Sequence, residues 1–183
     1  MATLFVLLAL IALVVFWAIS IYNRLIRMYN LKNEAWSGID VQLKRRFDLV
    51  PNLIEAVKGY AAHEKEVFMR VTEARAAVSR SQTVAERAEA ENMLTGALKS
   101  LFAVAENYPT LQASANFLQL QEQLGSLEND IQMSRRYYNG AARDYNIAIA
   151  TFPAVLIARR FGYEKADYFE AAEEERAAPK VAF

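Results

Sequence analysis

The first stretch of the chain is apolar and contains no charged side chain over residues 1–23, MATLFVLLALIALVVFWAISIYN. A helix of about 20 apolar residues is long enough to cross the hydrocarbon core of a bilayer. Trp17 and Tyr22 lie toward the end of the stretch, where aromatic rings favour the membrane interface, and Arg24 and Arg27 follow it. No Lys or Arg precedes the stretch, and it is longer than the apolar part of a usual signal peptide. These features predict a retained transmembrane anchor rather than a cleaved signal.

Apolar residues continue at helical spacing through residues 24–80, a range that contains one proline and two glycines. Seven-residue intervals separate one set of seam positions, and a companion set falls between them: Trp36, Leu43, Val50 and Val57, then Ile39, Leu53 and Tyr60. The pattern predicts one helix that runs from the anchor to about residue 80. At 1.5 Å per residue it would extend on the order of 80 Å beyond the membrane.

A second helix is expected to begin near Thr83, because Thr83 and Glu86 have the spacing of a capping box. Tyr108-Pro109 is expected to end it, since proline disfavours helical geometry in the residue before it. Its predicted apolar face consists of Met93, Leu94, Leu98, Leu101, Phe102 and Ala105.

The third helix, predicted over about 110–150, has the most regular spacing. Its bundle seam stands at consecutive seven-residue intervals: Phe117, Leu124, Ile131, Tyr138, Tyr145 and Phe152. Ser134, Ala141 and Ala148 occupy a second seam position, so a facing helix must supply bulk there. An unbroken heptad of this length predicts helix-on-helix packing at a small crossing angle. Pro153 is then expected to open a short helix, AVLIARR, that stops at Gly162.

Together these elements predict an all-α fold in three parts. An N-terminal transmembrane helix (1–23) continues into an antiparallel up-down-up bundle of long helices (24–169), closed by the short C-terminal helix. Residues 170–183 are expected to form an acidic, partly mobile tail.

The densest positive cluster of the chain is Lys44-Arg45-Arg46. Lys44 and Arg45 are interpreted as solvated helix surface. Arg46 falls on the seam, where one polar residue fixes the register of packed helices. A buried charge needs a partner, and Asp130 and Asp144 on the third helix are the candidates. The alternative is that the cluster forms a basic patch for a partner.

Pro51 follows this cluster in the same predicted helix. It removes one backbone hydrogen bond, yet the apolar spacing resumes in phase after it. A bend is therefore expected rather than an end. Arg46 and Pro51 are both interpreted as structural residues.

Charge and residue types narrow the classes of function. Lys+Arg and Asp+Glu both total 21, which disfavours a nucleic-acid partner because phosphate binding requires a basic surface. The chain has no cysteine, and His63 is its single histidine, so thiolate, zinc-protease and di-iron sites lack their ligands. No phosphate-binding glycine loop or nucleophile elbow is present. We therefore predict no catalytic residue, metal, cofactor or small-molecule substrate.

Positive charge also bears on topology. Arg24, Arg27 and Lys32 follow the predicted span, whereas only the amino terminus precedes it. The positive-inside tendency then predicts a single-pass protein of the cell (inner) membrane, with the bundle in the cytoplasm and the N-terminus outside.

Aromatic residues concentrate between residues 135 and 169. Aromatics beside arginines can stack on nucleic-acid bases. Half of them fall on the heptad seam here, so core packing is favoured. The apolar and basic run Phe152–Arg160 is expected either to close the bundle or to lie on a membrane surface.

Several long blocks resemble the LemA family: YNRLIRMYN, AWSGIDVQLKRRFDLVPNLIEAVKGYAAHE, RRYYNGAARDYN, FPAVLIARRFGY and the ending APKVAF. The resemblance covers nearly the whole chain. It implies a bacterial membrane protein with one span and an antiparallel helical bundle, in a family without an established enzymatic activity. Relatives are linked with membrane proteases of the HtpX type and with magnetosome formation.

The leading hypothesis is a non-enzymatic membrane-anchored scaffold that forms homo-oligomers or organises partners at the bilayer. One alternative is an adaptor or regulator of a membrane protease of the HtpX type in membrane quality control. Another is a membrane-remodelling factor that acts through Phe152–Arg160.

Overall fold

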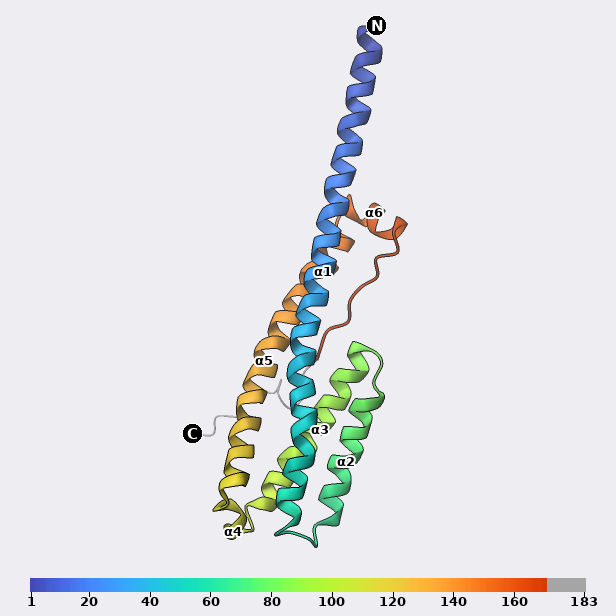
Figure 1. Cartoon of the computed structure of the whole chain (residues 1–183). Coiled ribbons are helices and arrows are strands. Elements are labelled where there is room, and N and C mark those ends of the chain that lie inside the picture. Colours follow the sequence, from blue (N-terminus) through green and yellow to red (C-terminus); the bar gives the residue numbers. More distant parts are fainter. Residues whose placement is uncertain (171–183) are drawn as a thin grey trace, which may run out of the picture. The chain divides into compact units, whose positions relative to one another are not determined.

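The computed structural model describes residues 1–170, and their regular secondary structure is entirely helical (Figure 1). The helices are α1 (Ala2–Lys58), α2 (Lys65–Arg80), α3 (Val84–Ala105), α4 (Pro109–Gln112), α5 (Ala115–Ala150) and α6 (Ala154–Arg160). They form two compact units. We call Met1–Ser37 with Tyr137–Asp167 the terminal unit, and Gly38–Arg136 with residues 168–170 the central unit. The predicted all-α class, with an apolar first helix that continues into a bundle, is confirmed.

The predicted helix over residues 24–80 is wrong in one place, because α1 ends at Lys58 and α2 begins at Lys65. Gly59, a poor helix former, is the first residue after α1. The backbone amide of Tyr60 then bonds the Val57 carbonyl at 3.0 Å, which tightens the chain into a turn. The central unit therefore contains four long helical segments in up-down-up-down order, one more than the sequence pattern indicated.

The start of α3 agrees with its prediction. Thr83 accepts a hydrogen bond from the Glu86 amide at 3.2 Å, and the Glu86 carboxylate accepts one from the Thr83 amide at 3.3 Å. This reciprocal capping box satisfies two donors at the end of the helix. α3 ends at Ala105, and Pro109 then opens the short α4, so that α5 begins at Ala115 rather than near 110.

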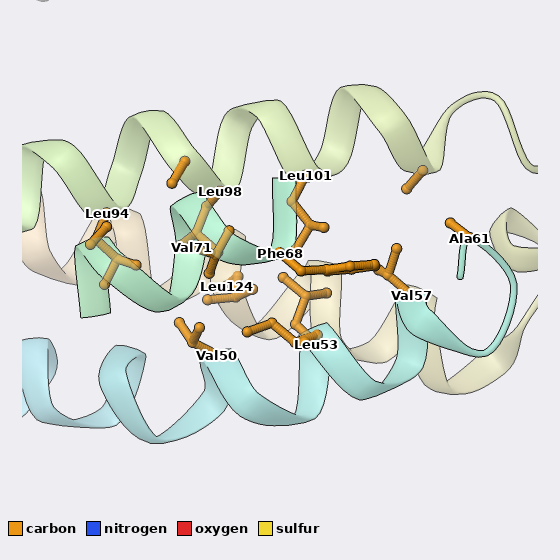
Figure 2. Close-up of a cluster of buried hydrophobic side chains, with 14 of the residues drawn as sticks. Val50, Leu53, Val57, Ala61, Phe68, Val71, Leu94, Leu98, Leu101 and Leu124 are labelled. Carbon is orange, nitrogen blue, oxygen red and sulfur yellow. The ribbon is translucent and has the colours of Figure 1, made fainter. Parts of the chain in front are cut away.

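The core of the central unit collects apolar side chains from all four segments. Figure 2 shows them converging: Val50, Leu53 and Val57 from α1, Phe68 and Val71 from α2, Leu94, Leu98 and Leu101 from α3, and Leu124 from α5. Met93, predicted on the apolar face of α3, is instead 54% exposed. Met93 directly precedes Leu94, so a helix that buries Leu94 turns Met93 by about 100° away from the core.

The terminal unit has its own smaller core. Leu25 of α1, Tyr145, Ala148 and Ile149 of α5, and Ala158 of α6 pack together. Gly162 follows α6 with a φ of 71°, the left-handed conformation expected of a glycine that stops a helix. The predicted acidic tail lies outside the described residues, apart from Glu170.

The predicted seam of α5 is buried at five of its six positions: Phe117, Leu124, Ile131, Tyr138 and Tyr145. Phe152 is the exception, because it lies beyond the end of the helix at Ala150 and is 75% exposed. α1 continues through Pro51 without a break, and the bend there stays a prediction.

Candidate membrane interface and buried ion-pair cluster

The N-terminal part of α1 exposes apolar side chains around its whole circumference. Nearly every side chain from Met1 to Ser20 is exposed, including that of Trp17 at 51%. A soluble protein rarely leaves an apolar surface of this size in water. Among the described residues, α1 is also the one helix long and apolar enough to cross a membrane.

The side chains of α1 become partly buried at the same point of the sequence where its charged residues begin. Ile21 and Tyr22 are half-buried, Arg24 and Arg27 are exposed, and Leu25 is buried. The uncovered apolar segment therefore ends within one helical turn of the first charged residue. The Tyr22 ring lies 4.7 Å from that of Phe161, centroid to centroid. Tyr22, Arg24 and Arg27 thus lie where burial and charge both change, whereas Trp17 lies within the uncovered segment, and their position at a membrane interface stays a prediction.

Aromatic side chains on α1 follow this boundary at seven-residue intervals, at Tyr22, Tyr29 and Trp36. Tyr29 packs on Tyr145 and on Tyr163, with 6.0 Å between centroids in both pairs, and Trp36 meets Tyr138 edge-on at 5.3 Å. Tilted and edge-on pairs of this kind add to the apolar contact itself. The predicted seam starts at Trp36, and Tyr22 and Tyr29 extend it by two further positions.

The segment after α6 is held against α5 by three side chains, and we call residues 163–167 the strap. Tyr138 donates to the Asp167 carbonyl at 2.8 Å, and Tyr145 donates to the Glu164 carbonyl at 2.9 Å. Asn146 both donates to the Ala166 carbonyl (2.9 Å) and accepts from its amide (2.8 Å). Asn146 was not among the predicted site residues. The signal for it in the sequence is an asparagine, a residue with low helix propensity, beside the seam residue Tyr145 inside a long helix.

Burial affects the chemistry of one of these groups. Removal from water raises the pKa of Tyr138 to about 12, and the nearby Asp167 carboxylate adds to the effect. Its hydroxyl therefore stays protonated and remains a hydrogen-bond donor to the strap throughout the neutral range.

α6 has two different faces. Ala158 is buried in the core of the terminal unit, and Ala154 and Ile157 pack against the same core. On the other side Leu156, Arg159 and Arg160 are exposed. The run Phe152–Arg160 therefore packs on the terminal unit through one face only.

Arg46 lies at the centre of a buried ion-pair cluster in the central unit, with 1% of its surface exposed. One guanidinium nitrogen, Nη2, contacts Glu91 Oε2 at 2.5 Å. The other, Nη1, pairs with Glu128 and donates to Thr95 Oγ1 at 2.9 Å. Arg87 bonds the second oxygen of Glu91 at 3.0 Å. Arg46 thus joins α1 to α3 and α5, and its role in fixing the register of these helices stays a prediction.

Asp130 and Asp144, the predicted partners of Arg46, are wrong. Glu128 holds that position on α5, because it lies four residues after Leu124 and three before Ile131, on the buried face. Asp144 instead pairs with Arg143. Glu91 was missed because it comes from α3, and its neighbours Glu89 and Asn92 give it the look of a solvated stretch.

Burial disfavours the charged form of Arg46, but the carboxylates of Glu128 and Glu91 more than offset this, so the pKa of Arg46 stays above its usual value. Its Nε has no hydrogen-bond partner. Both carboxylates are paired with arginines, so the cluster holds α1, α3 and α5 together.

The remaining candidates lie on the surface. Lys44 pairs with Asp48 at 2.7 Å and both are exposed, as solvated helix residues are. His63 is exposed in the turn between α1 and α2. Within residues 1–170 no three acidic or histidine side chains are placed to hold a metal.

A helical bundle joined to a long uncovered apolar helix defines the class of membrane-associated helical-bundle proteins. Comparison with known proteins narrows this class. The chain belongs to the LemA family, which it matches over residues 35–183.

Three relatives illustrate the range of the family. Magnetosome protein MamQ of Magnetospirillum gryphiswaldense is 24% identical over 174 residues, and MamQ 2 of Paramagnetospirillum magneticum is 26% identical over 175. In both comparisons the match covers 81% of this chain and 64% of the relative, so the chain spans less than two thirds of their length. Protein LemA of Metamycoplasma hominis is 29% identical over 159 residues, covering 84% of this chain and 71% of that protein.

Proposed function

We propose that the chain is a non-enzymatic scaffold, anchored in the bacterial inner membrane by α1, that self-associates and organises partners there. One observation carries the proposal: a helix that is apolar and uncovered up to Ser20 continues without a break to Lys58, inside a packed bundle. An anchor on a flexible linker would leave the bundle free to tumble. Here α1 joins the apolar segment to the bundle without a linker.

Two further observations support a scaffold. The buried ion pairs of Arg46 hold three helices together, and α1 and α5 are long helices of 57 and 36 residues. Two relatives are named for the magnetosome, which fits a family whose members work as parts of a larger assembly.

The experiment is the native mass of the full-length protein in mild detergent, measured beside that of residues 24–183. We expect the full-length chain to form a discrete assembly of several copies. In-membrane crosslinking should then trap the same neighbours repeatedly, and single introduced cysteines suit this purpose because the chain has none of its own. A monomer in both forms, with only random crosslinks, would contradict self-association.

A further inference from the structure

The exposed face of α6 carries apolar and basic side chains together. Phe152, Leu156 and Phe161 are exposed to 75%, 59% and 59%, and Arg159 and Arg160 are exposed beside them. Two large aromatic rings and a leucine within ten residues form an apolar surface that water does not favour. Something other than the terminal unit's own core must cover this face, because that core already packs on the opposite side at Ala158.

The position of α6 along α1 indicates what covers it. From Ala2 to Tyr22, α1 rises about 30 Å, which is the thickness of a bilayer's hydrocarbon core. Tyr22 is therefore the last residue of the span, and its ring contacts Phe161 directly at the end of α6. α6 lies at the height where the hydrocarbon ends and the headgroups begin.

The strap fixes this height. Tyr145 and Asn146 hold Glu164 and Ala166 on α5 by hydrogen bonds of 2.8–2.9 Å, two residues beyond Gly162. α6 is thereby held at both ends, since Ala150 of α5 precedes it by only a few residues. It is a positioned element of the terminal unit.

The charges of this region suit an anionic surface. Arg24 and Arg27 of α1 and Arg159 and Arg160 of α6 are all exposed, as is Glu164 shortly after α6, so positive charge is in excess. The nearby carboxylate of Asp144 is paired with Arg143 at 3.0 Å. Each arginine near an anionic bilayer strengthens association roughly fivefold.

We propose that α6 is a second membrane contact, in addition to the span. Leu156, with Phe152 and Phe161, enters the boundary between headgroups and acyl chains, and Arg159 and Arg160 bind the phosphates of anionic lipids. This inference rests on the proposed anchoring by α1. Through it the chain holds the bilayer at two places, which fixes the rotation of α1 about its own axis as well as its depth.

The test uses the full chain in nanodiscs, either of phosphatidylcholine alone or with phosphatidylglycerol added. An environment-sensitive fluorophore is attached to Leu156→Cys. Lipids brominated near the headgroup quench labels at the interface, and lipids brominated deep in the acyl chains quench labels within the span. The matched controls are Leu10→Cys within the span and Met69→Cys, an exposed apolar residue of α2. We expect strong lipid quenching at Leu156 in anionic discs, weaker quenching in neutral discs, and none at Met69. Arg159→Gln with Arg160→Gln should reduce the difference between the two lipids, and Arg24 and Arg27 account for what remains.

The controls separate the possible failures. A Leu156 label quenched by aqueous iodide as strongly as the Met69 label, while Leu10 is quenched by lipid, overturns this inference and leaves the anchor intact. A Leu10 label that lipid does not quench overturns the anchor itself. A Leu156 label shielded from both quenchers, and crosslinked to a second copy, shows that the face binds protein and also overturns the inference.

Discussion

At the scale of single residues, Arg46 carries a full positive charge although only 1% of its surface is exposed, and removing such a charge from water is costly in free energy. Two carboxylates and a threonine hydroxyl offset this cost. Glu91 and Thr95 lie on α3 and Glu128 lies on α5, whereas Arg46 lies on α1. Because such a network is satisfied in only one arrangement, it selects that arrangement over slipped ones.

Replacing Arg46 with alanine is expected to destabilise the bundle strongly. The change leaves the Glu91 carboxylate buried with only Arg87 as a partner, and breaking a buried pair costs on the order of 3–5 kcal/mol. Arg45→Ala, at the exposed neighbouring position, should change stability by less than about 0.5 kcal/mol. The measurement is thermal unfolding of the full chain in detergent. Equal losses in the two variants would refute the structural role of Arg46.

Tyr138 should make stability fall in strongly alkaline solution. Its pKa is about 12 in the fold, against about 10 for an unfolded tyrosine, so the fold favours the protonated hydroxyl. The stabilisation is complete below pH 10 and is lost as the pH rises toward 12. The stability advantage of the wild type over Tyr138→Phe should therefore shrink across this window. Denaturant titrations at several pH values measure it, with exposed Tyr137→Phe as control, and a constant advantage would contradict the assignment.

From the sequence it was easier to find polar residues at apolar seam positions than to find their contact partners. Arg46 stood out because a charge interrupted an apolar repeat. Its partners could not be derived, because Glu91 and Glu128 lie far away along the chain and helix spacing says nothing about which helix will face Arg46. The sequence also gave little indication of what Asn146 contacts, because its partner is the backbone of Ala166, which no side-chain pattern reveals.

At the scale of elements, local chemistry predicted helix ends where a capping box, a proline or a glycine marks them. Thr83 with Glu86, Pro153 and Gly162 each mark an end that the structure contains. The end of α1 at Lys58 was missed because the apolar repeat continues across it. Val57 and Ala61 are buried on the two sides of the turn, so the apolar spacing gives no sign that the chain reverses direction between α1 and α2.

The strap gives the element-scale prediction. Asn146→Ala removes two hydrogen bonds to Ala166 and leaves both backbone groups of that residue without their partner. Leaving a buried donor or acceptor without its hydrogen-bond partner costs roughly 1–3 kcal/mol of stability. We expect faster amide hydrogen exchange in residues 163–167 with little change in the α2–α3 hairpin. Asn129→Ala, an exposed asparagine on the same helix, is the control, and unchanged exchange in the strap would refute its attachment through Asn146.

At the scale of the whole molecule, α1 and α5 each contribute to both units, and α1 also supplies the apolar span. Mean composition alone would not separate these parts. The separation comes from the position of the charges, which are absent up to Asn23 and frequent afterwards. The same asymmetry is the basis for predicting topology.

Topology can be tested with single cysteines, since the chain contains none. In intact cells, Ala2→Cys should react with a membrane-impermeant maleimide from outside. Glu122→Cys, exposed on α5, should react only after the cells are opened. This expectation rests on Arg24, Arg27 and Lys32, which follow the apolar stretch and favour the cytoplasmic side. The reverse pattern of labelling would place the bundle outside the cytoplasm.

The composition of the terminal unit has a consequence for how the protein is made. Its two halves come from distant parts of the chain, so Tyr22, Tyr29 and Trp36 leave the ribosome long before Tyr138, Tyr145 and Phe161. The α2–α3 hairpin is local and can form early, whereas the contacts of the terminal unit must wait for the last of its segments. A nascent chain already inserted in the bilayer therefore presents an uncovered aromatic stripe beside the membrane until translation passes the strap. Chains that end before residue 137 would keep this aromatic surface exposed and would be prone to aggregate.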